Sequence, residues 1–415
     1  MHSNFTESAG LSKGLVPVES YISQKFFDLE RDKVFSKVWL CMGRIDDVPN
    51  PGDYIVRDIE ICKASVLVTH TKSGAIRAYH NVCMHRGNQV VWEKKGSRKT
   101  MFRCPYHAWT YSGNDGSLIA VSDEEYFFDL DKKKCGLKSI ECDTWDGWLF
   151  INLNPDNDVS LQDYLGGMGN FMSGIPYPNT QRAIDIEAII NCNWKVLVDA
   201  FSESYHIPFL HSKTIGPSFS SKSDPAGHLQ NLECFGPHHS ISLYGNPEYK
   251  TPANQKVELL AYAGMESENV LSAAQSQDVE DLRNHPAVNP GKSKTWSMDI
   301  NEVFPNYHID IGGGGFWTHE IWPIDVNKSR YIMRFYVPEP EDVRGAFHQE
   351  HYISRLADVV LEDLANVERT QRGLESGVIT HMNLQDNEVL VRRLHHLLGK
   401  FYGSESLKKA IQESA

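Results

Sequence analysis

The chain has 415 residues and a formal net charge of −13 at neutral pH, with 41% hydrophobic and 23% charged residues. This length suggests two or three domains of ordinary globular composition. The acidic balance argues against nucleic acid or an anionic membrane as a partner. The eight cysteines are too few for a disulfide scaffold in a chain of this length.

The start of the chain shows no targeting signal in its composition. The first twenty residues lack a basic region followed by an apolar one, so they do not resemble a secretory signal. No apolar run approaches the ~18 residues of a membrane span. With free thiols in addition, these features predict a cytoplasmic protein that has no membrane partner.

Three regions follow one another along the chain. Residues 1–45 are expected to form a helical entry segment, because the apolar residues between Glu19 and Gly43 recur roughly at helical spacing. Residues 46–158 contain short β-branched runs separated by turn signals such as KSG, SGNDG and PDND, which is typical of a small all-β domain.

The third region, residues 159–415, mixes strands with helices. One long helix is expected over 345–376, and a Gly-, Ser- and Pro-rich stretch over 215–255 is expected to be a long loop. The strands and helices do not alternate regularly, so the region is predicted to be α+β with an antiparallel sheet.

Two short loops of the all-β region carry candidate metal ligands in the order Cys-x-His, eighteen residues, Cys-x-x-His. These ligands are Cys83, His85, Cys104 and His107. Coincidence, a redox disulfide and a zinc site are alternatives, but zinc sites usually pair cysteine with cysteine and histidine with histidine. In a Rieske [2Fe–2S] centre, one iron takes two cysteines and the other takes two histidines. Two loops that each supply one thiolate and one imidazole match that arrangement.

A second set of candidates lies in NCNWKVLVDAFSESYHIPFLH, residues 191–211. Asp199, Glu203 and His206 are spaced to fall on one face of a helix. Pro208 is expected to break that helix and to turn His211 back beside His206. An exposed acidic helix face with two incidental histidines is the alternative, but the aromatic surroundings favour a metal site.

The long helix over 345–376 offers a third ligand. Asp363 falls in its apolar stripe, with Glu362 beside it, and a buried carboxylate needs a partner. The guanidinium of Arg369 or Arg372 is one candidate partner, through an ion pair. A metal ion is the other candidate. His206, His211 and Asp363 would then form the 2-His-1-carboxylate triad of non-haem Fe(II) oxygenases.

The motifs together resemble a known family. CMHRG followed by CPYHAWTYSGNDGSL closely resembles the Rieske domain of ring-hydroxylating oxygenase α-subunits. NWKVLVDAFSESYHIPFLH and LEDLANVERTQRG are similar to the segments that hold the mononuclear iron in that family. The resemblance implies a Rieske domain over 46–158 and a helix-grip, START-like catalytic domain over 159–415, on which residues 1–45 pack.

The resemblance also implies two cofactors, a [2Fe–2S] Rieske cluster and a mononuclear non-haem Fe(II). Glu203 matches the acid that bridges to a cluster histidine of a neighbouring subunit, and Asp199 matches a position behind the iron ligands, so both are candidate catalytic residues. Electron transfer across subunits implies a homotrimer, with or without a small β subunit. The sequence shows no FAD or NAD motif, since GGGG at 312–315 is not a G-x-G-x-x-G loop. A ferredoxin, a flavin reductase or both are therefore expected to carry electrons from NAD(P)H.

The implied function is the terminal oxygenase of a multicomponent system. Such an enzyme uses O₂ and external electrons to hydroxylate a hydrophobic or aromatic small molecule. Glu203 stands where dihydroxylating members carry Asp, and it resembles members that act as monooxygenases or demethylases. N- or O-dealkylation, including that of a quaternary ammonium compound, is thus the alternative. Candidate apolar pocket residues are Phe201, Phe209, Leu210, Phe304, Phe316, Trp317 and Trp322.

Two hypotheses from other classes also remain. One is a pure electron-transfer protein with a lipid-binding helix-grip domain and no second iron. The other is a structural zinc protein. Metal content separates all three, because the oxygenase needs a cluster and one further iron.

Overall fold

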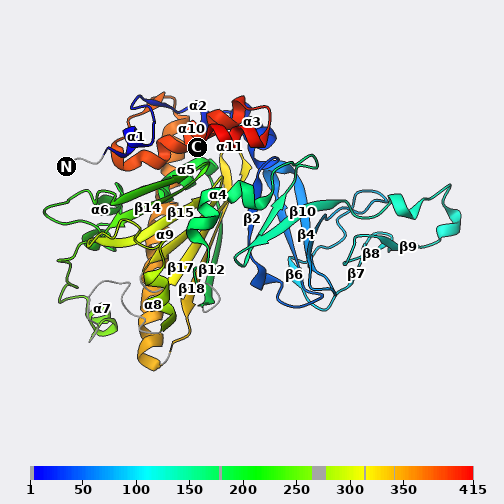
Figure 1. Ribbon diagram of the computed structural model, residues 1–415, viewed down its shortest axis with the longest axis horizontal. Coiled ribbons are helices and arrows are strands. Elements are labelled where there is room, and N and C mark those ends of the chain that lie inside the picture. The colour runs from blue at the N-terminus through cyan, green and yellow to red at the C-terminus, as the bar shows by residue number, and fades with distance from the viewer. Residues whose placement is uncertain (1–3, 177–179, 264–276, 313–314, 341, 415) are drawn as a thin grey trace. The chain divides into compact units, whose positions relative to one another are not determined.

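The computed structural model describes residues 4–176, 180–263, 277–312, 315–340 and 342–414 (Figure 1). The chain divides into two compact units. The first combines the residues up to Asp28 with those from Leu165 onwards, and the second runs from Leu29 to Tyr164. None of the helices in these described ranges has the length and apolar character needed to cross a membrane.

The Leu29–Tyr164 unit is built from β-strands. A seven-stranded antiparallel sheet has the order β2-β11-β10-β5-β4-β3-β6, and a three-stranded sheet has the order β7-β8-β9. The strands are β2 (Trp39–Arg44), β3 (Tyr54–Ile59), β4 (Ala64–His70), β5 (Ile76–His80), β6 (Lys95–Gly96), β7 (Met101–Arg103), β8 (Thr110–Ser112), β9 (Leu118–Ala120), β10 (Ser139–Trp145) and β11 (Trp148–Asn152). Short 3-10 turns lie at Ile45–Asp47, Glu60–Cys62, Glu124–Tyr126 and Lys132–Lys134.

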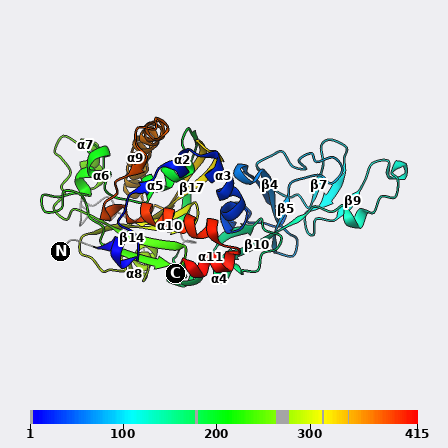
Figure 2. The same ribbon diagram turned by 90° about the horizontal axis from the view of Figure 1, so that it is seen from above.

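The other unit is organised around a second seven-stranded antiparallel sheet, with the order β12-β18-β17-β16-β15-β14-β13. Its strands are β12 (Thr180–Ile190), β13 (Asn231–Phe235), β14 (His238–Tyr244), β15 (Trp296–Val303), β16 (Tyr307–Gly312), β17 (Gly315–Asp325) and β18 (Lys328–Pro338). The sheet lies between α5 and α9 on one face and α4 and α8 on the other (Figure 2). Of these helices, α9 carries the candidate iron ligand Asp363, and α5 leads into the segment that carries His206 and His211.

The helices that lie wholly or largely in this unit differ greatly in length. They are α1 (Phe5–Ser8), α2 (Glu19–Ile22), α3 (Gln24–Glu30), α4 (Leu161–Met172), α5 (Trp194–Phe201), α6 (Ile207–Leu210), α7 (Lys256–Ala261), α8 (Gln277–Asn284), α9 (Val343–Glu375), α10 (Val389–Gly403) and α11 (Leu407–Glu413), with 3-10 turns at Gly216–Ser218 and Asp386–Glu388. The longest, α9, begins where the Asp342 side chain accepts a hydrogen bond from the backbone N–H of Gly345. Its buried residues Val360, Val367 and Leu374 recur at helical spacing, which explains how the helix packs on the sheet.

The N-terminal segment is tied to the C-terminal part of the same unit. Strand β1 (Val16–Pro17) pairs with β19 (His381–Met382). The backbone N–H groups of Phe5 and Thr6 donate to the Asp386 carboxylate at 2.9 and 2.8 Å, across 381 and 380 residues of sequence. A carboxylate that accepts two backbone amides fixes the entry of the chain at this point.

The α+β class with an antiparallel sheet is confirmed, as is the long helix near 345–376. Two other expectations were wrong in part. The expected helix near the N-terminus ends in a π-helical turn at Arg31–Phe35, and the chain continues as strand β2. The stretch 215–255 contains strands β13 and β14 and is therefore not one loop. The GGGG motif falls partly outside the described residues, but Gly312 pairs with Gly315 across β16 and β17.

Candidate metal centres

The segment that carries the predicted iron ligands is not one continuous helix. Helix α5 ends at Phe201, residues 202–206 are irregular, and α6 begins at Ile207. The expected helical face through Asp199, Glu203 and His206 was thus wrong. Pro208 lies in the first turn of α6, where the missing N–H costs nothing, so it does not break a helix there.

His206, His211 and Asp363 nevertheless converge. One ligand atom from each lies within 4.8 Å of the other two, which makes them a group that could hold a metal ion. Asp363 Oδ1 lies 3.0 Å from His211 Nε2 and 3.5 Å from His206 Nε2. The two imidazole rings have centroids 5.1 Å apart and stand nearly perpendicular, at 71°.

The hydrogen bonds of the two histidines leave only acceptors at the centre of this group. His206 Nδ1 faces Glu203 Oε1, and His211 Nδ1 lies 2.7 Å from Glu362 Oε2. Neutral imidazoles that donate from Nδ1 turn lone pairs on Nε2 toward Asp363. Asp363 Oδ1 is buried and has no hydrogen-bond partner in the described part of the chain. Three converging acceptors without a donor fit a cation such as Fe(II).

Glu203 is held close to its own loop. Its carboxylate accepts hydrogen bonds from the backbone N–H groups of Tyr205 and His206, in addition to its contact with the His206 ring. Burial lowers the pKa of His206, but the Glu203 and Asp363 carboxylates outweigh burial, and the net shift is upward. Glu203 therefore orients the imidazole by electrostatic attraction and by a hydrogen bond at the same atom.

Glu362 has a role that sequence reasoning missed, although its position beside Asp363 was noted. Glu362 Oε2 accepts from His211 Nδ1 and also from Thr214 Oγ1, at 2.8 Å. Arg355 then donates to the Thr214 carbonyl at 2.9 Å, and to Glu258 Oε1 at 2.8 Å. Consecutive acidic residues on a ligand helix are a usable signal, because one can bind metal while the next orients a second ligand.

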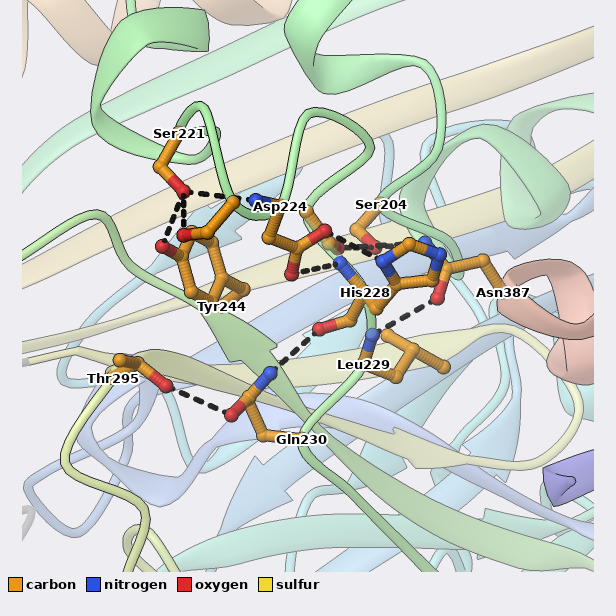
Figure 3. Close-up of polar contacts among 11 residues, drawn as sticks. Ser204, Ser221, Asp224, His228, Leu229, Gln230, Tyr244, Thr295 and Asn387 are labelled. Atoms are coloured by element: carbon orange, nitrogen blue, oxygen red, sulfur yellow. Dashed lines mark hydrogen bonds and ion pairs between the residues drawn. The ribbon is translucent and has the colours of Figure 1, made fainter. Parts of the chain in front are cut away.

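A polar network anchors the irregular segment from the other side (Figure 3). Ser204 Oγ donates to the Gly227 carbonyl at 2.9 Å, and Asn387 Nδ2 donates to Ser204 Oγ at 3.3 Å. Asn387 Oδ1 also accepts from the Leu229 N–H at 2.9 Å. Asp224 Oδ1 lies 2.5 Å from His228 Nδ1, and Figure 3 shows this pair beside the Ser204 and Asn387 contacts. These contacts fix the residue next to Glu203.

Asp199 lies behind the ligands, in the wall of a cavity of about 260 Å³ that Glu203, His206 and Asp363 also line. It accepts a hydrogen bond from the Tyr21 hydroxyl, which also lies 2.7 Å from His395 Nε2. Asp199 Oδ1 has no hydrogen-bond partner among the described residues. Burial raises the pKa of Asp199 to about 8, against an ordinary value of 3.8.

This raised pKa predicts a pH-dependent stability. Between pH ~4 and pH ~8 the native state keeps the Asp199 proton and the unfolded chain loses it, so the free energy of unfolding falls as pH rises. Asp199→Asn cannot ionise, and its melting temperature is expected to exceed that of the wild type increasingly toward pH 8. Thermal unfolding from pH 5 to pH 8 measures this. Parallel plots of melting temperature against pH for the two proteins would contradict this prediction. The control is Asp358→Asn, which removes an exposed carboxyl from α9.

The four predicted cluster ligands also come together, in the all-β unit. Cys83 and Cys104 are buried in its core, whereas His85 and His107 are half-buried, with ring centroids 4.6 Å apart. The histidines line an open cavity of about 610 Å³, together with Pro105 and Cys104. Buried thiols beneath outward-facing imidazoles fit a cluster with one cysteine-bound and one histidine-bound iron.

The two ligand loops share one backbone pattern. The N–H of Gly87 donates to the Cys83 carbonyl at 2.9 Å, and the N–H of Ala108 donates to the Cys104 carbonyl at 3.0 Å. Both donors have positive φ, +78° and +59°. Glycine adopts this conformation easily, whereas alanine is strained in it. The equivalence of the loops places each cysteine and histidine in a matching position.

Aromatic residues surround these loops. Trp109 stacks on His85 with centroids 5.0 Å apart, and Tyr106 lies over His107 with centroids 3.7 Å apart. Tyr111 was missed from sequence: its hydroxyl lies 3.2 Å from Cys83 Sγ and accepts from the Met84 N–H at 2.9 Å. With Cys83 bound to a cluster as a thiolate, the Tyr111 hydroxyl would be the donor to its sulfur, a contact that tunes such clusters. Tyr111 follows Trp109 by two residues, so alternation along β8 places both on the same side. This spacing could have predicted Tyr111 from the sequence.

The predicted apolar pocket residues do not gather around one site. Phe209 is 63% exposed. Phe304 packs on Phe401 of α10, and Phe316 stacks on Tyr336. Phe201 stacks on the ring of His319 at 4.3 Å, and Leu210 lines the cavity that Glu203, His206 and Asp363 also line. Most of these aromatics therefore serve the packing of the sheet.

Rieske non-haem iron proteins combine two features. One is an all-β domain with two cysteine and two histidine ligands, and the other is an α+β domain with two histidines and an aspartate that converge. The family model of the Rieske [2Fe–2S] domain matches residues 38–129, and that of the ring hydroxylating alpha subunit (catalytic domain) matches residues 177–404. The second match spans more than half of the chain. The chain belongs to the family of ring-hydroxylating alpha subunits, whose cofactors are a Rieske [2Fe–2S] cluster and a mononuclear non-haem iron.

Two curated relatives match part of this chain, at 32% and 30% identity. The chain is 32% identical over 207 residues to the carnitine monooxygenase oxygenase subunit of Escherichia coli strain K12, covering 49% of this chain and 53% of that one. It is 30% identical over 251 residues to the N,N-dimethyl phenylurea N-demethylase subunit alpha of Sphingobium sp. strain YBL2, covering 57% and 54%. The chain spans about half the length of the curated relatives it matches.

Solved structures share the fold over nearly the whole chain. The quaternary ammonium Rieske monooxygenase CntA, in complex with an inhibitor, superposes with a TM-score of 0.74 at 20% identity. The match covers 97% of this chain and 99% of that one. At this identity, the likeness establishes the Rieske oxygenase fold, including the helix-grip arrangement of the catalytic domain.

Proposed function

We propose that the protein is the terminal oxygenase component of a Rieske system, which uses O₂ and externally supplied electrons to oxidise a small molecule. The convergence of His206, His211 and Asp363, with only acceptors at its centre, carries this proposal. The family match supports it, because the same chain also has the Rieske domain that would supply electrons.

Each predicted ligand has a role in this proposal. Bound Fe(II) supplies open coordination positions for O₂, and the cluster supplies electrons one at a time. The mononuclear iron is assigned to His206, His211 and Asp363. The cluster is assigned to Cys83, His85, Cys104 and His107.

The chain's own side chains hold these ligands in place. Glu203 and Glu362 each keep a proton on Nδ1 of one ligand histidine, which leaves Nε2 free to bind metal. Asp199 holds Tyr21 beneath α5 and keeps the ligand segment in position. Glu203 lines a cavity with His206 and Asp363 and is the proposed bridge to a cluster histidine of a second subunit.

The proposed assembly is a homotrimer, with or without a small β subunit, that receives electrons from a ferredoxin, a flavin reductase or both. A solved structure of a quaternary ammonium Rieske monooxygenase gives insights into inter-subunit electron transfer in that enzyme, which supports a bridge between subunits in this chain. NAD(P)H is the proposed ultimate donor.

Dealkylation is the second candidate reaction, alongside hydroxylation of a hydrophobic or aromatic compound. Two observations favour it: the acid at position 203 is Glu, and a 30% identical relative is named as an N-demethylase. Incubation with a reductase, NADH and N-methyl compounds separates the reactions. Formaldehyde indicates demethylation, and a cis-diol from an arene would refute the monooxygenase hypothesis.

Metal analysis tests the oxygenase proposal itself. The holoprotein is expected to contain the cluster and one further iron per chain, with Rieske absorption and EPR signals after reduction. A cluster without the further iron would indicate a pure electron-transfer protein. Zinc without iron would refute both.

Glu203→Gln tests the bridging role. The amide keeps the size of the side chain but loses the charge that orients His206, so substrate-coupled turnover is expected to fall by about 10- to 100-fold or more. Both metal centres should remain, as judged by iron content and the Rieske spectrum. Reduction of the cluster should also remain fast, which locates the defect after electron entry. Full activity would show that the proposed bridge is wrong. Glu187→Gln, an exposed carboxylate on β12, is the matched control.

A further inference from the structure

An ion pair between α7 and α9 lies beside the ligand segment of the mononuclear iron site. Arg355 Nη1 donates to Glu258 Oε1 at 2.8 Å, and the two side chains are exposed by only 10% and 7%. Glu258 Oε1 also accepts from the Tyr249 hydroxyl and from Thr251 Oγ1, both at 3.1 Å. An ion pair this buried is weak evidence for a stabilising role, since desolvation offsets much of its attraction. Its contacts on both sides are the better guide to what it does.

The same arginine also holds the residue that follows the iron ligand His211 by three positions. Arg355 Nη2 donates to the Thr214 carbonyl at 2.9 Å, while Nη1 binds Glu258. The planar guanidinium presents its donors in a fixed fork, so the positions of its two acceptors are tied to each other. Arg355 thus links α7 to the ligand segment through a single rigid group.

Thr214 extends this restraint to the ligand itself. Its backbone N–H donates to the His211 carbonyl at 3.0 Å, and its hydroxyl donates to Glu362 Oε2 at 2.8 Å. The same carboxylate oxygen lies 2.7 Å from His211 Nδ1. Arg355 and Glu362 are about two helical turns apart, so both lie on the face of α9 that meets Thr214. The network of contacts from Glu258 to the imidazole is therefore continuous.

We propose that Glu258 and Arg355 are positioning residues for His211, and that this network couples the fold of α7 to the binding of the mononuclear iron. Their role rests on the proposed function, which assigns that metal to His206, His211 and Asp363. An imidazole with a fixed partner at Nδ1 keeps its Nε2 lone pair aimed at the metal, and loss of such an outer partner costs about 10- to 100-fold in metal affinity. Because coupling between two sites is reciprocal, bound iron should in turn hold α7 in place.

Release of Fe(II) from the holoprotein to a ferrous chelator measures the effect, with the Rieske absorption as a record of the intact cluster. Arg355→Met, Thr214→Val and Glu362→Ala should each speed iron release by about tenfold or more, because each breaks one link of the network. Thr214→Val keeps the shape of the side chain and leaves no charge unpaired, so it reports on the link itself. The matched control is Arg344→Met, which removes an exposed arginine from α9 and should release iron at the wild-type rate.

Double-mutant cycles separate a positioning role from a general loss of packing. Glu362→Ala already cuts the network, so adding Arg355→Met or Glu258→Gln to it should change the release rate by less than about twofold. In the wild-type background, both substitutions should speed release. Additive effects in either cycle would overturn the proposal, as would a wild-type release rate in folded Thr214→Val or Glu258→Gln. Melting temperature identifies folded variants, and these two carry the test if Arg355→Met does not fold.

Hydrogen exchange tests the reciprocal effect on α7. Removal of the mononuclear iron with the chelator should increase amide exchange in α7 and leave exchange in α11 unchanged, since α11 lies outside the network. In Glu258→Gln the response of α7 should shrink, because the link between α7 and α9 is weakened. Equal exchange in α7 with and without iron in the wild type would overturn the coupling.

Neither measurement needs O₂, a reductase or a substrate, so the result is separate from that of the oxygenase proposal. A protein whose three ligands bind metal in a coupled manner, but which oxidises no substrate, would refute the proposed function and leave the coupling in place. An active oxygenase whose iron release is unaffected by Thr214→Val would refute only the coupling. A protein that binds no metal at these ligands would refute both.

Discussion

His206→Ala is expected to remove the mononuclear iron and to leave the Rieske cluster intact. The variant retains only His211 and Asp363 as ligands, and two ligands do not hold Fe(II) in a site with open positions. Turnover is expected to fall below about 1% of the wild-type rate, because loss of an outer partner of a ligand alone costs about 10- to 100-fold. Iron analysis and the Rieske spectrum should show the cluster iron and nothing more.

The control for this variant is His396→Ala, which removes an exposed histidine from α10. It should keep all iron and full activity. Asp363→Ala should behave like His206→Ala, although it also removes the buried oxygen that lacks a hydrogen-bond partner. If either ligand variant retained the complete iron content, the assignment of the mononuclear site would be wrong.

Cys104→Ala should have an equally large effect on the other centre. Cys104 is a buried core residue of the all-β unit, so the variant loses both a cluster ligand and the cross-link between the two ligand loops. The Rieske absorption and EPR signals should disappear, and the unit should lose at least about 3 kcal/mol of stability. The mononuclear iron should remain, because its ligands belong to the other compact unit.

Cys234→Ala is the matched control, since Cys234 is an exposed free thiol on β13. Its spectrum and unfolding curve should match the wild type. A normal Rieske spectrum in Cys104→Ala would exclude Cys104 as a ligand. Urea unfolding followed by tryptophan fluorescence gives the stability difference directly.

Sequence alone identified the groups that converge, because metal chemistry restricts both residue type and spacing. His206, His211 and Asp363 were selected on those grounds, and the structure brings them within 4.8 Å. The path of the chain between them could not be predicted in the same way. Helix α5 stops at Phe201, where the next residue, Ser202, bonds to Glu302, a hundred residues away. A local periodicity rule cannot detect such a partner.

The strands β13 and β14 were missed for a similar reason. Strand β14 is buried along its whole length, yet it reads HHSISLY, with four polar residues in seven. Several of its polar groups have long-range partners, such as Asp299 for Ser242 and Glu302 for His239. Buried polar strands lack the apolar alternation by which strands are recognised in a sequence. The run VWLCMG near residue 40 was predicted to be helical but forms strand β2. A short apolar run fits a buried strand as well as a helix, so its sequence does not decide between them.

The tie between the two ends of the chain has a consequence for biosynthesis. The Leu29–Tyr164 unit is continuous in sequence, so it can close and acquire its metal while the ribosome is still translating the rest. The N-terminal segment cannot settle at that stage, since β1 requires β19 and Phe5 requires Asp386. Pairings over such distances form slowly. The Leu29–Tyr164 unit should therefore fold while the rest of the chain is still unfolded. The catalytic unit should complete its fold last, after its C-terminal helices have left the ribosome.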